Sequence, residues 1–283
     1  MFSLKLENER GNVVDINDGV NYLVVSVSGL NPPSASIFTT KSPNRKGSKY
    51  NGSTLNERYI VVQIKILGDI EVNRNALYDW TYTEQYVKVR YKNGLRDVYC
   101  EGHIEDHDND FFTDNEVINL SILCENPYWK DLQEISTEIT AIIAQFTFAF
   151  AIGATGIPFS TLKESNTTNI FNEGAETGIR VTIRCRGAVK NITFYDAVNA
   201  SRRLTINTTI EKDWLVEIDT TASPKTVKAY KPDGTVVNLM RYLAPSPVWF
   251  TLKKGNNVFA FVAESGQDDM EVSVSFTNIY LGV

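Results

Sequence analysis

The chain has 283 residues, of which 42% are apolar and 22% charged, and its formal net charge is −6. This length suits one large domain or two of ordinary size, and the composition is that of a globular protein. The negative charge leaves no electrostatic footprint for nucleic acid or an anionic membrane. The most apolar stretch, residues 141–152, is shorter than the about 20 residues that span a bilayer. Because the start of the chain also lacks a signal-peptide pattern, we expect a soluble protein without membrane contact.

Strands are expected in most of the first half. Apolar and polar residues alternate there with the two-residue period of a strand that has one buried face. The alternation is clearest in residues 58–66, 85–102 and 118–124, and residues 22–27 are a short β-branched stretch.

The stretch 85–102 contains Asn93 and Gly94 between two alternating segments. This dipeptide predicts a β-hairpin with a type I′ turn, which requires two residues with positive φ. The best helix candidate in this half is short and covers residues 72–82.

A long segment, residues 28–56, is rich in Pro, Gly, Ser, Thr and Asn. It also carries four basic side chains, Lys41, Arg45, Lys46 and Lys49. Loops of this length are uncommon in a compact domain and are usually functional or mobile. Two interpretations remain open: a solvated, partly disordered loop, or an arm that becomes ordered on a partner.

The densest polar cluster is residues 100–116, which contains both histidines, His103 and His107, among acidic residues. On a strand these two histidines lie about 13 Å apart, too far to bind one ion. The aspartates resemble the start of a calcium loop, but Phe111 stands where the loop needs glycine and Val117 where it needs a carboxylate. We therefore favour a hydrated acidic loop over a metal site.

The strand that ends near Cys124 is followed by Pro127, which cannot donate to a sheet, and then by Trp129. This segment is expected to close a β-rich first domain, 1–133, with Trp129 as a buried anchor. Residues 131–150 give mixed signals, which we interpret as a linker that runs into a strand. Further strands are then expected at 179–185, 191–196, 214–219, 225–230, 248–252, 257–263 and 271–276. Their spacing predicts a second domain, 134–283, that is an antiparallel β-sandwich.

No sequence pattern points to catalysis or to a cofactor. Nucleophile elbows, glycine-rich phosphate loops and zinc-protease motifs are all missing. The three cysteines, Cys100, Cys124 and Cys185, are widely spaced and are interpreted as reduced, mostly buried thiols. We therefore expect neither an enzyme nor a protein that carries a metal or cofactor.

Several segments occur together in an order that resembles the distal tail proteins of long-tailed bacteriophages. They are a Gly-Leu-x-x-Pro turn, a strand that begins with Arg, an Arg-x-x-Leu helix start and a closing Cys-x-x-Pro-aromatic-Trp. The matching residues are Gly29, Leu30, Pro33, Arg58, Arg74, Leu77, Cys124, Pro127 and Trp129. The second half is similar to the galectin-like sandwich of this family.

The resemblance implies a mainly β, structural protein of the virion tail tip, made in the host bacterial cytoplasm. First domains would form a homohexameric ring that joins the tail tube protein to the tail-associated hub protein of the baseplate. DNA would pass through the lumen without specific binding, and the sandwiches would hold receptor-binding or other baseplate proteins. We expect 1–133 to assemble alone and 134–283 to stay monomeric.

One alternative is a carbohydrate-binding module that uses the second domain for attachment to the host surface. It depends on aromatic residues such as Trp214 and Trp249, although packing in the core explains these more simply. The second domain contains no histidine, so it lacks the histidine of the sugar site of true galectins.

Overall fold

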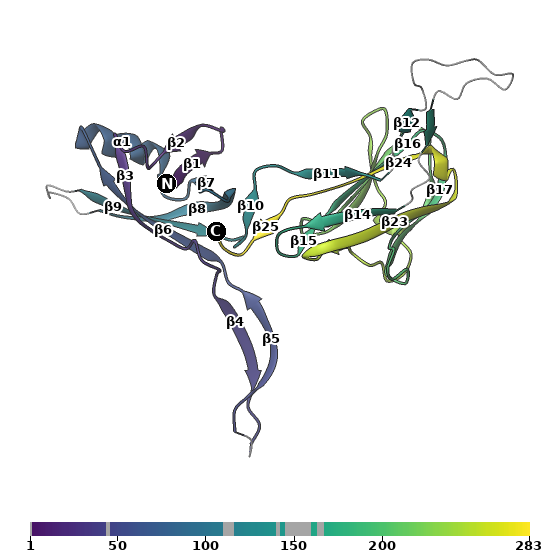
Figure 1. The fold of residues 1–283 in the computed structure, drawn as a ribbon, viewed down its shortest axis with the longest axis horizontal. Coiled ribbons are helices and arrows are strands. Elements are labelled where there is room, and N and C mark those ends of the chain that lie inside the picture. Colours follow the sequence, from purple (N-terminus) through teal and green to yellow (C-terminus); the bar gives the residue numbers. More distant parts are fainter. Residues whose placement is uncertain (1, 44–45, 110–115, 140–141, 145–159, 163–166) are drawn as a thin grey trace. The chain divides into compact units, whose positions relative to one another are not determined.

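The computed structural model describes residues 2–43, 46–109, 116–139, 142–144, 160–162 and 167–283. Contacts within the chain define two compact units. The first combines residues 1–132 with 279–283, and the second is residues 133–278. No helix in the described ranges is long and apolar enough to cross a membrane. The mainly β fold expected from the sequence is confirmed (Figure 1).

A twisted antiparallel sheet forms the body of the first unit. Its strands, in spatial order, are β2 (Val13–Asp15), β1 (Ser3–Asn8), β7 (Tyr86–Lys92), β8 (Asp97–Asn109), β9 (Val117–Cys124), β6 (Arg58–Ile66) and β3 (Tyr22–Ser28). Two short strands extend it, because β10 (Trp129–Asp131) pairs with both β8 and β25 (Ile279–Tyr280).

The core of this unit lies on one face of the sheet. In β6, the alternating residues Ile60, Val62, Ile64 and Ile66 are all buried, as their period predicts. The helix α1 (Ile70–Trp80) places Leu77 in the same core. It begins two residues earlier than expected because the Asp69 side chain accepts a hydrogen bond from the Val72 backbone N–H, which caps the first turn.

The hairpin between β7 and β8 is present, but the turn type expected from the sequence is wrong. Neither Asn93 nor Gly94 has positive φ. The connection instead spans residues 93–96, and the Asn93 side chain accepts hydrogen bonds from the backbone N–H groups of Leu95 and Arg96. Asparagine side chains commonly stabilise turns in this way.

A second, separate hairpin consists of β4 (Ala35–Thr40) and β5 (Lys49–Leu55). Figure 1 shows it projecting away from the sheet of the first unit. The expectation of an irregular loop across residues 28–56 is therefore wrong for both of these stretches. Arg45 lies outside the described residues.

Two antiparallel sheets that share one hydrophobic core form the second unit. The larger contains β11 (Ile135–Glu138), β24 (Met270–Phe276), β16 (Arg180–Cys185), β19 (Leu215–Asp219), β20 (Thr226–Tyr230) and β21 (Val236–Asn238). The other contains β14 (Thr167–Asn172), β23 (Gly255–Ser265), β17 (Val189–Asp196) and β18 (Arg203–Ile210). Short pairs are formed by β12 (Ile142–Ala144) with β13 (Ser160–Leu162) and by β15 (Thr177–Gly178) with β22 (Thr251–Leu252).

Three aromatic rings pack together in this core beside the four-stranded sheet. The ring centroid of Phe194 lies 5.3 Å from that of Phe250 and 5.2 Å from that of Phe259. Such offset and edge-on arrangements are favourable for aromatic pairs. The antiparallel sandwich is thus present, whereas its likeness to galectins and the division into independent domains at residue 133 stay predictions. Part of the stretch 131–150, interpreted from the sequence as a linker that runs into a strand, lies outside the described residues, namely 140–141 and 145–150.

Candidate functional site

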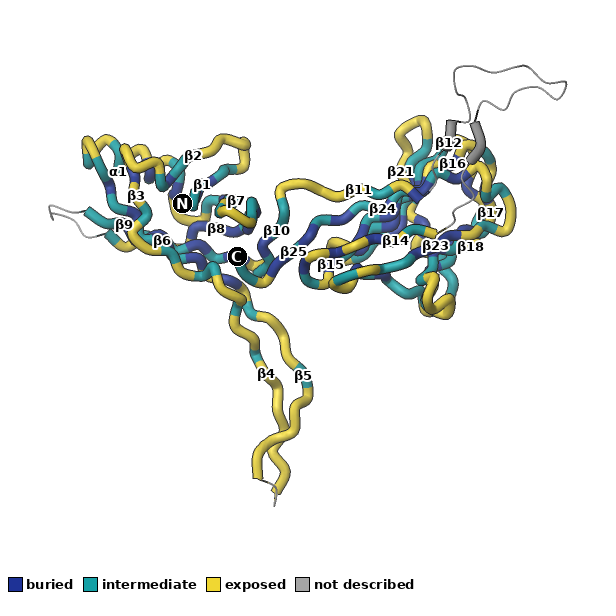
Figure 2. The backbone as a smooth tube through the Cα atoms, viewed as in Figure 1, coloured by how far each residue is buried: buried dark blue, intermediate teal, exposed yellow. Residues whose placement is uncertain are grey.

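The hairpin β4–β5 is the most exposed regular structure in the first unit. Figure 2 shows solvent exposure along nearly its whole length. Ile37 and Phe38 are 64% and 53% exposed, and Tyr50 and Leu55 on the facing strand are exposed as well. Among the described residues, β4 and β5 pair only with each other. Apolar side chains gathered on an uncovered element are typical of a protein interaction surface.

The free end of this hairpin is basic. Lys41, Lys46 and Lys49 are all exposed, and no ion pair is formed by any of them within the described part of the chain. The other end is well ordered by hydrogen bonds. Asn56 donates its backbone N–H to the Ser34 carbonyl oxygen at 3.0 Å, and the Ser36 hydroxyl donates to Asn56 Oδ1 at 2.7 Å.

Directly beside this end of the hairpin lies Arg58, the first residue of β6, with 2% of its surface exposed. Its guanidinium donates hydrogen bonds to four backbone carbonyl oxygens. Nε binds the oxygen of Pro127 at 2.8 Å, Nη2 that of Leu281 at 2.5 Å, and Nη1 those of Asn31, at 2.7 Å, and Gly29. The planar fork of donors in arginine suits several acceptors at fixed directions. Three separate segments of the chain, at residues 29–31, 127 and 281, therefore meet at the Arg58 side chain. We call this arrangement the Arg58 cluster.

No carboxylate faces the buried charge of Arg58 within the described residues. Burial lowers the pKa of the guanidinium, while the nearby thiols of Cys100 and Cys124 raise it. Arginine remains protonated in proteins, so the carbonyl dipoles take over the solvation that water would provide.

Trp129 is fully buried and belongs to the same cluster. The Cζ atom of Arg58 lies 5.4 Å from the centroid of the Trp129 ring, within the range of a cation–π contact. The burial expected for this side chain is present. A buried indole N–H is expected to donate to a partner such as a backbone carbonyl, but Nε1 of Trp129 has no hydrogen-bond partner among the described residues.

A close approach of two backbones requires glycine at position 29. Gly29 has φ +84, and a Cβ atom there would lie 2.0 Å from the carbonyl oxygen of Tyr59. An L side chain would meet both the unfavourable conformation and the clash. The neighbouring Leu30 packs against the core, and Pro33 is half-buried just before β4.

The expected motif positions thus fall into two groups. Arg74 and Leu77 lie on α1, where Arg74 Nη1 forms an ion pair with Glu116 Oε2 at 2.7 Å. The other positions surround Arg58 or lead directly to it: Gly29, Leu30, Pro33, Cys124, Pro127 and Trp129.

The acidic loop expected at residues 100–116 is instead part of the strand β8 as far as Asn109. Both histidines lie on this strand. His103 Nδ1 pairs with Glu125 Oε1 at 2.8 Å, and His107 Nε2 lies 2.9 Å from Thr81 Oγ1. Thr81 donates its hydroxyl proton to the Leu77 carbonyl oxygen, so Oγ1 accepts from His107. The described residues contain no group of three metal-ligating side chains.

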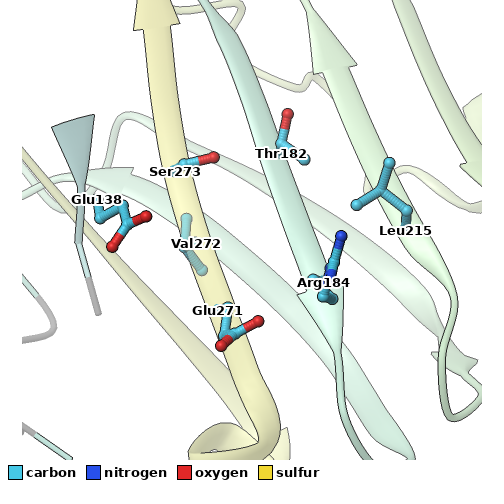
Figure 3. Close-up of a pocket in the computed structure, with 7 residues that line it drawn as sticks. All are labelled: Glu138, Thr182, Arg184, Leu215, Glu271, Val272 and Ser273. Carbon is cyan, nitrogen blue, oxygen red and sulfur yellow. The ribbon is translucent and has the colours of Figure 1, made fainter. Parts of the chain in front are cut away.

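On the second unit, a hollow of about 310 Å³ lies against the larger sheet (Figure 3). Its described lining combines Glu138, Thr182, Arg184, Glu271 and Ser273 with apolar side chains of β19 and β24, and includes no aromatic ring.

The two tryptophans of the second unit pack partly against its core. Lys231 Nζ lies 4.9 Å from the Trp214 ring centroid and Lys225 Nζ 5.9 Å from that of Trp249. Each ring therefore has a lysine side chain near one of its faces.

Sequence reasoning missed two participants in the Arg58 cluster, Asn31 and Leu281. Both contribute only a backbone carbonyl, which leaves no mark on the choice of side chain. The sequence offered one indirect signal for such carbonyl partners. An arginine that lies in an apolar, alternating strand needs hydrogen-bond acceptors for its buried N–H groups.

Two family models match the chain. The model described as "Phage tail protein RIFT-related domain" matches residues 9–117. That described as "Siphovirus-type tail component, C-terminal domain" matches residues 174–280. Together they cover more than half of the chain, in the order expected from the resemblance. The chain belongs to the Dit family of phage distal tail proteins. It is therefore a structural component of the virion tail and not an enzyme.

A solved structure shows the same fold. The crystal structure of Dit from phage SPP1 is 14% identical, with a TM-score of 0.69 over 99% of both chains. That protein is described as a paradigm of the hub adsorption apparatus in phages that infect Gram-positive bacteria. A chain of the phage p2 baseplate in its activated conformation with Ca is 13% identical over 97% of this chain and 98% of that one, with a TM-score of 0.48. No curated protein matches this distal tail protein in sequence.

Proposed function

We propose that this distal tail protein forms a homohexameric ring through its first unit. The ring joins the tail tube protein to the tail-associated hub protein and leaves a lumen for DNA. The exposed hairpin β4–β5 is the observation that supports this most directly, because it carries apolar side chains that the described chain leaves uncovered. An arm that binds a different surface on the next copy creates a heterologous interface, and such an interface generates a ring when the rotation between copies closes.

The number of six subunits comes from the family resemblance, as do the tube and hub partners. Passage of DNA without specific binding agrees with the net charge of −6, because a tightly binding lumen would be expected to be basic. The second unit would then be free to hold receptor-binding or other baseplate proteins. Synthesis in the cytoplasm of the host bacterium agrees with three free, buried cysteines.

The experiment is native mass spectrometry of the full chain, with light scattering over a range of concentrations. The expected species has six times the chain mass of 31.8 kDa. The double substitution Ile37→Ser with Phe38→Ser should abolish assembly and leave the folded monomer intact, because both side chains are exposed in one copy.

A matched control is Val198→Ser, which removes an apolar side chain that is 83% exposed in the second unit. This variant should assemble like the natural chain. A full chain that stays monomeric at high micromolar concentration would contradict the ring. Equal assembly of all three proteins would instead contradict the role of the hairpin.

A further inference from the structure

The last five residues of the chain complete the first unit. Tyr280 in β25 pairs with Trp129 in β10, and its hydroxyl donates to Asp131 Oδ2 at 3.0 Å. The guanidinium of Arg96 stacks on the Tyr280 ring, with Cζ 3.7 Å from the ring centroid. Residues 279–283 are thereby held by ring stacking, a side-chain hydrogen bond and strand pairing.

Beyond β25, the same segment reaches the residues that lead into the hairpin. The Leu281 carbonyl oxygen accepts from Arg58, and the Val283 backbone N–H donates to the Leu30 carbonyl oxygen at 3.2 Å. A Cβ atom on Gly282 would lie 2.9 Å from Cδ of Pro32. Residues 279–283 therefore pack directly against residues 29–32, which immediately precede β4.

We infer that residues 279–283 are a C-terminal latch that positions the hairpin β4–β5 through Arg58, so that a chain presents its arm in the assembling orientation only while this segment is docked on the first unit. The inference rests on the proposed ring function, because it assigns a control to the same arm. Arg58 is a positioning residue in this scheme, and the latch supplies one of its four acceptors.

The physical reason lies in the weakness of an isolated hairpin. A two-stranded hairpin is marginally stable in water and has no core of its own, so its direction is set by its base. That base is held by the Gly29 and Asn31 carbonyls on Nη1 of Arg58. Without Leu281, a donor on Nη2 of the buried guanidinium loses its acceptor, and the side chain must turn or admit water to recover one.

The test measures hairpin position in single subunits by electron spin resonance. Nitroxide labels are attached to cysteines introduced by Ser42→Cys, at the free end of the hairpin, and Leu95→Cys, on the exposed turn after β7. The three natural cysteines are buried and should react slowly. Labelled chains are diluted with unlabelled chains, so that the measured distances arise within one subunit.

A chain that ends at Asn278 should broaden the distance distribution at least two-fold relative to the full chain and should lose assembly. Gly282→Val, which keeps the full length but clashes with Pro32, should broaden it in the same sense. The matched control is Leu281→Ala, because it retains the carbonyl that Arg58 binds. This control should give the distribution and the assembly of the full chain.

Amide hydrogen exchange in β6 is followed in every variant to show that the first unit stays folded. Unchanged distance distributions in both the shortened chain and Gly282→Val would overturn the latch. Loss of exchange protection throughout β6 in Gly282→Val would also overturn it, because the segment would then be a general part of the core. The distances are measured within one subunit, so a full chain that fails to assemble refutes the ring and leaves this test intact.

Discussion

Replacement of Trp129 by alanine should destabilise the first unit more than the second. Trp129 is fully buried, contacts Arg58 and Tyr91, and pairs with Tyr280 through its backbone. Truncation of a large buried aromatic side chain typically costs about 3–5 kcal/mol of unfolding free energy. The loss of stability should affect three segments at once, because the indole ring of Trp129 lies where β10, β25 and the Arg58 cluster meet.

The unpaired indole N–H places the expected loss at the lower end of this range. A buried donor without an acceptor costs a native protein about 1–3 kcal/mol, and Trp129 already bears such a donor. Alanine removes the packing and this penalty together, so we expect a net loss of about 3 kcal/mol. Trp129→Phe keeps most of the packing and removes the donor, so its loss should be about 1 kcal/mol or less.

The assay is urea unfolding followed by amide exchange and mass spectrometry, which reports β6 and β9 separately from β16. Pro127→Ala is the matched control, since it retains the carbonyl that Arg58 binds and should cost about 1 kcal/mol. The reasoning is refuted if Trp129→Ala is neutral, or if Trp129→Phe is as damaging as Trp129→Ala. An equal loss of stability in β16, which belongs to the second unit, would refute the independence of the two units.

Three further outcomes are expected. Burial lowers the pKa of His107, so as the pH falls this side chain is protonated in the unfolded chain before it is protonated in the folded one. The free energy of unfolding should therefore decrease as the pH drops below about 6.5. His107→Gln should reduce this pH dependence in thermal melts. Treatment with a chelator of divalent ions should leave Tm unchanged, because residues 100–116 lack a complete ligand set, and a drop restored by calcium or zinc would contradict this. Gly29→Ala should destabilise the first unit strongly by its clash with Tyr59, whereas Gly11→Ala, also at positive φ but with open space around it, should cost much less in urea titrations.

Local patterns predicted the strands well where burial alternates cleanly. The stretch 58–66 coincides with β6, and 118–124 with all but the first residue of β9. In both, side chains on one face enter a core and side chains on the other stay accessible, so the period of two is visible in the sequence. By contrast, β18 was missed because Thr208 interrupts the series of apolar residues, Leu204, Ile206 and Ile210, that are buried on one face.

The hairpin β4–β5 was harder to predict for a different reason. Its strands bury almost nothing, so the hydrophobic alternation that identifies a strand is weak there. Composition alone favoured a loop, and the alternative of an arm depended on length and basic charge. A strand pair whose apolar side chains are left for another molecule does not carry the pattern of a strand that folds onto its own core.

The Arg58 cluster shows a further limit of local patterns. The turn at Gly29, the start of β6 and the exit at Pro127 were recognised as separate features. Their meeting at one guanidinium depends on backbone carbonyls and on Leu281, which lies 223 positions away in the chain. Sequence spacing contains no information about such a contact, because any residue type supplies the same acceptor.

The choice of arginine at position 58 follows from what these carbonyls require. An apolar side chain would remove the donors that these four carbonyl oxygens bind, and each oxygen that stays shielded from water would then carry a desolvation cost of about 1–3 kcal/mol. Lysine would keep the charge, but its donors all radiate from one nitrogen and cannot reach acceptors around a planar fork. Arginine alone joins the base of the hairpin, the exit from β9 and the C-terminal latch in one fixed arrangement. The same residue that closes the core therefore also determines where the hairpin leaves it, and this links the folding of the first unit to the direction in which the arm is offered to its partner.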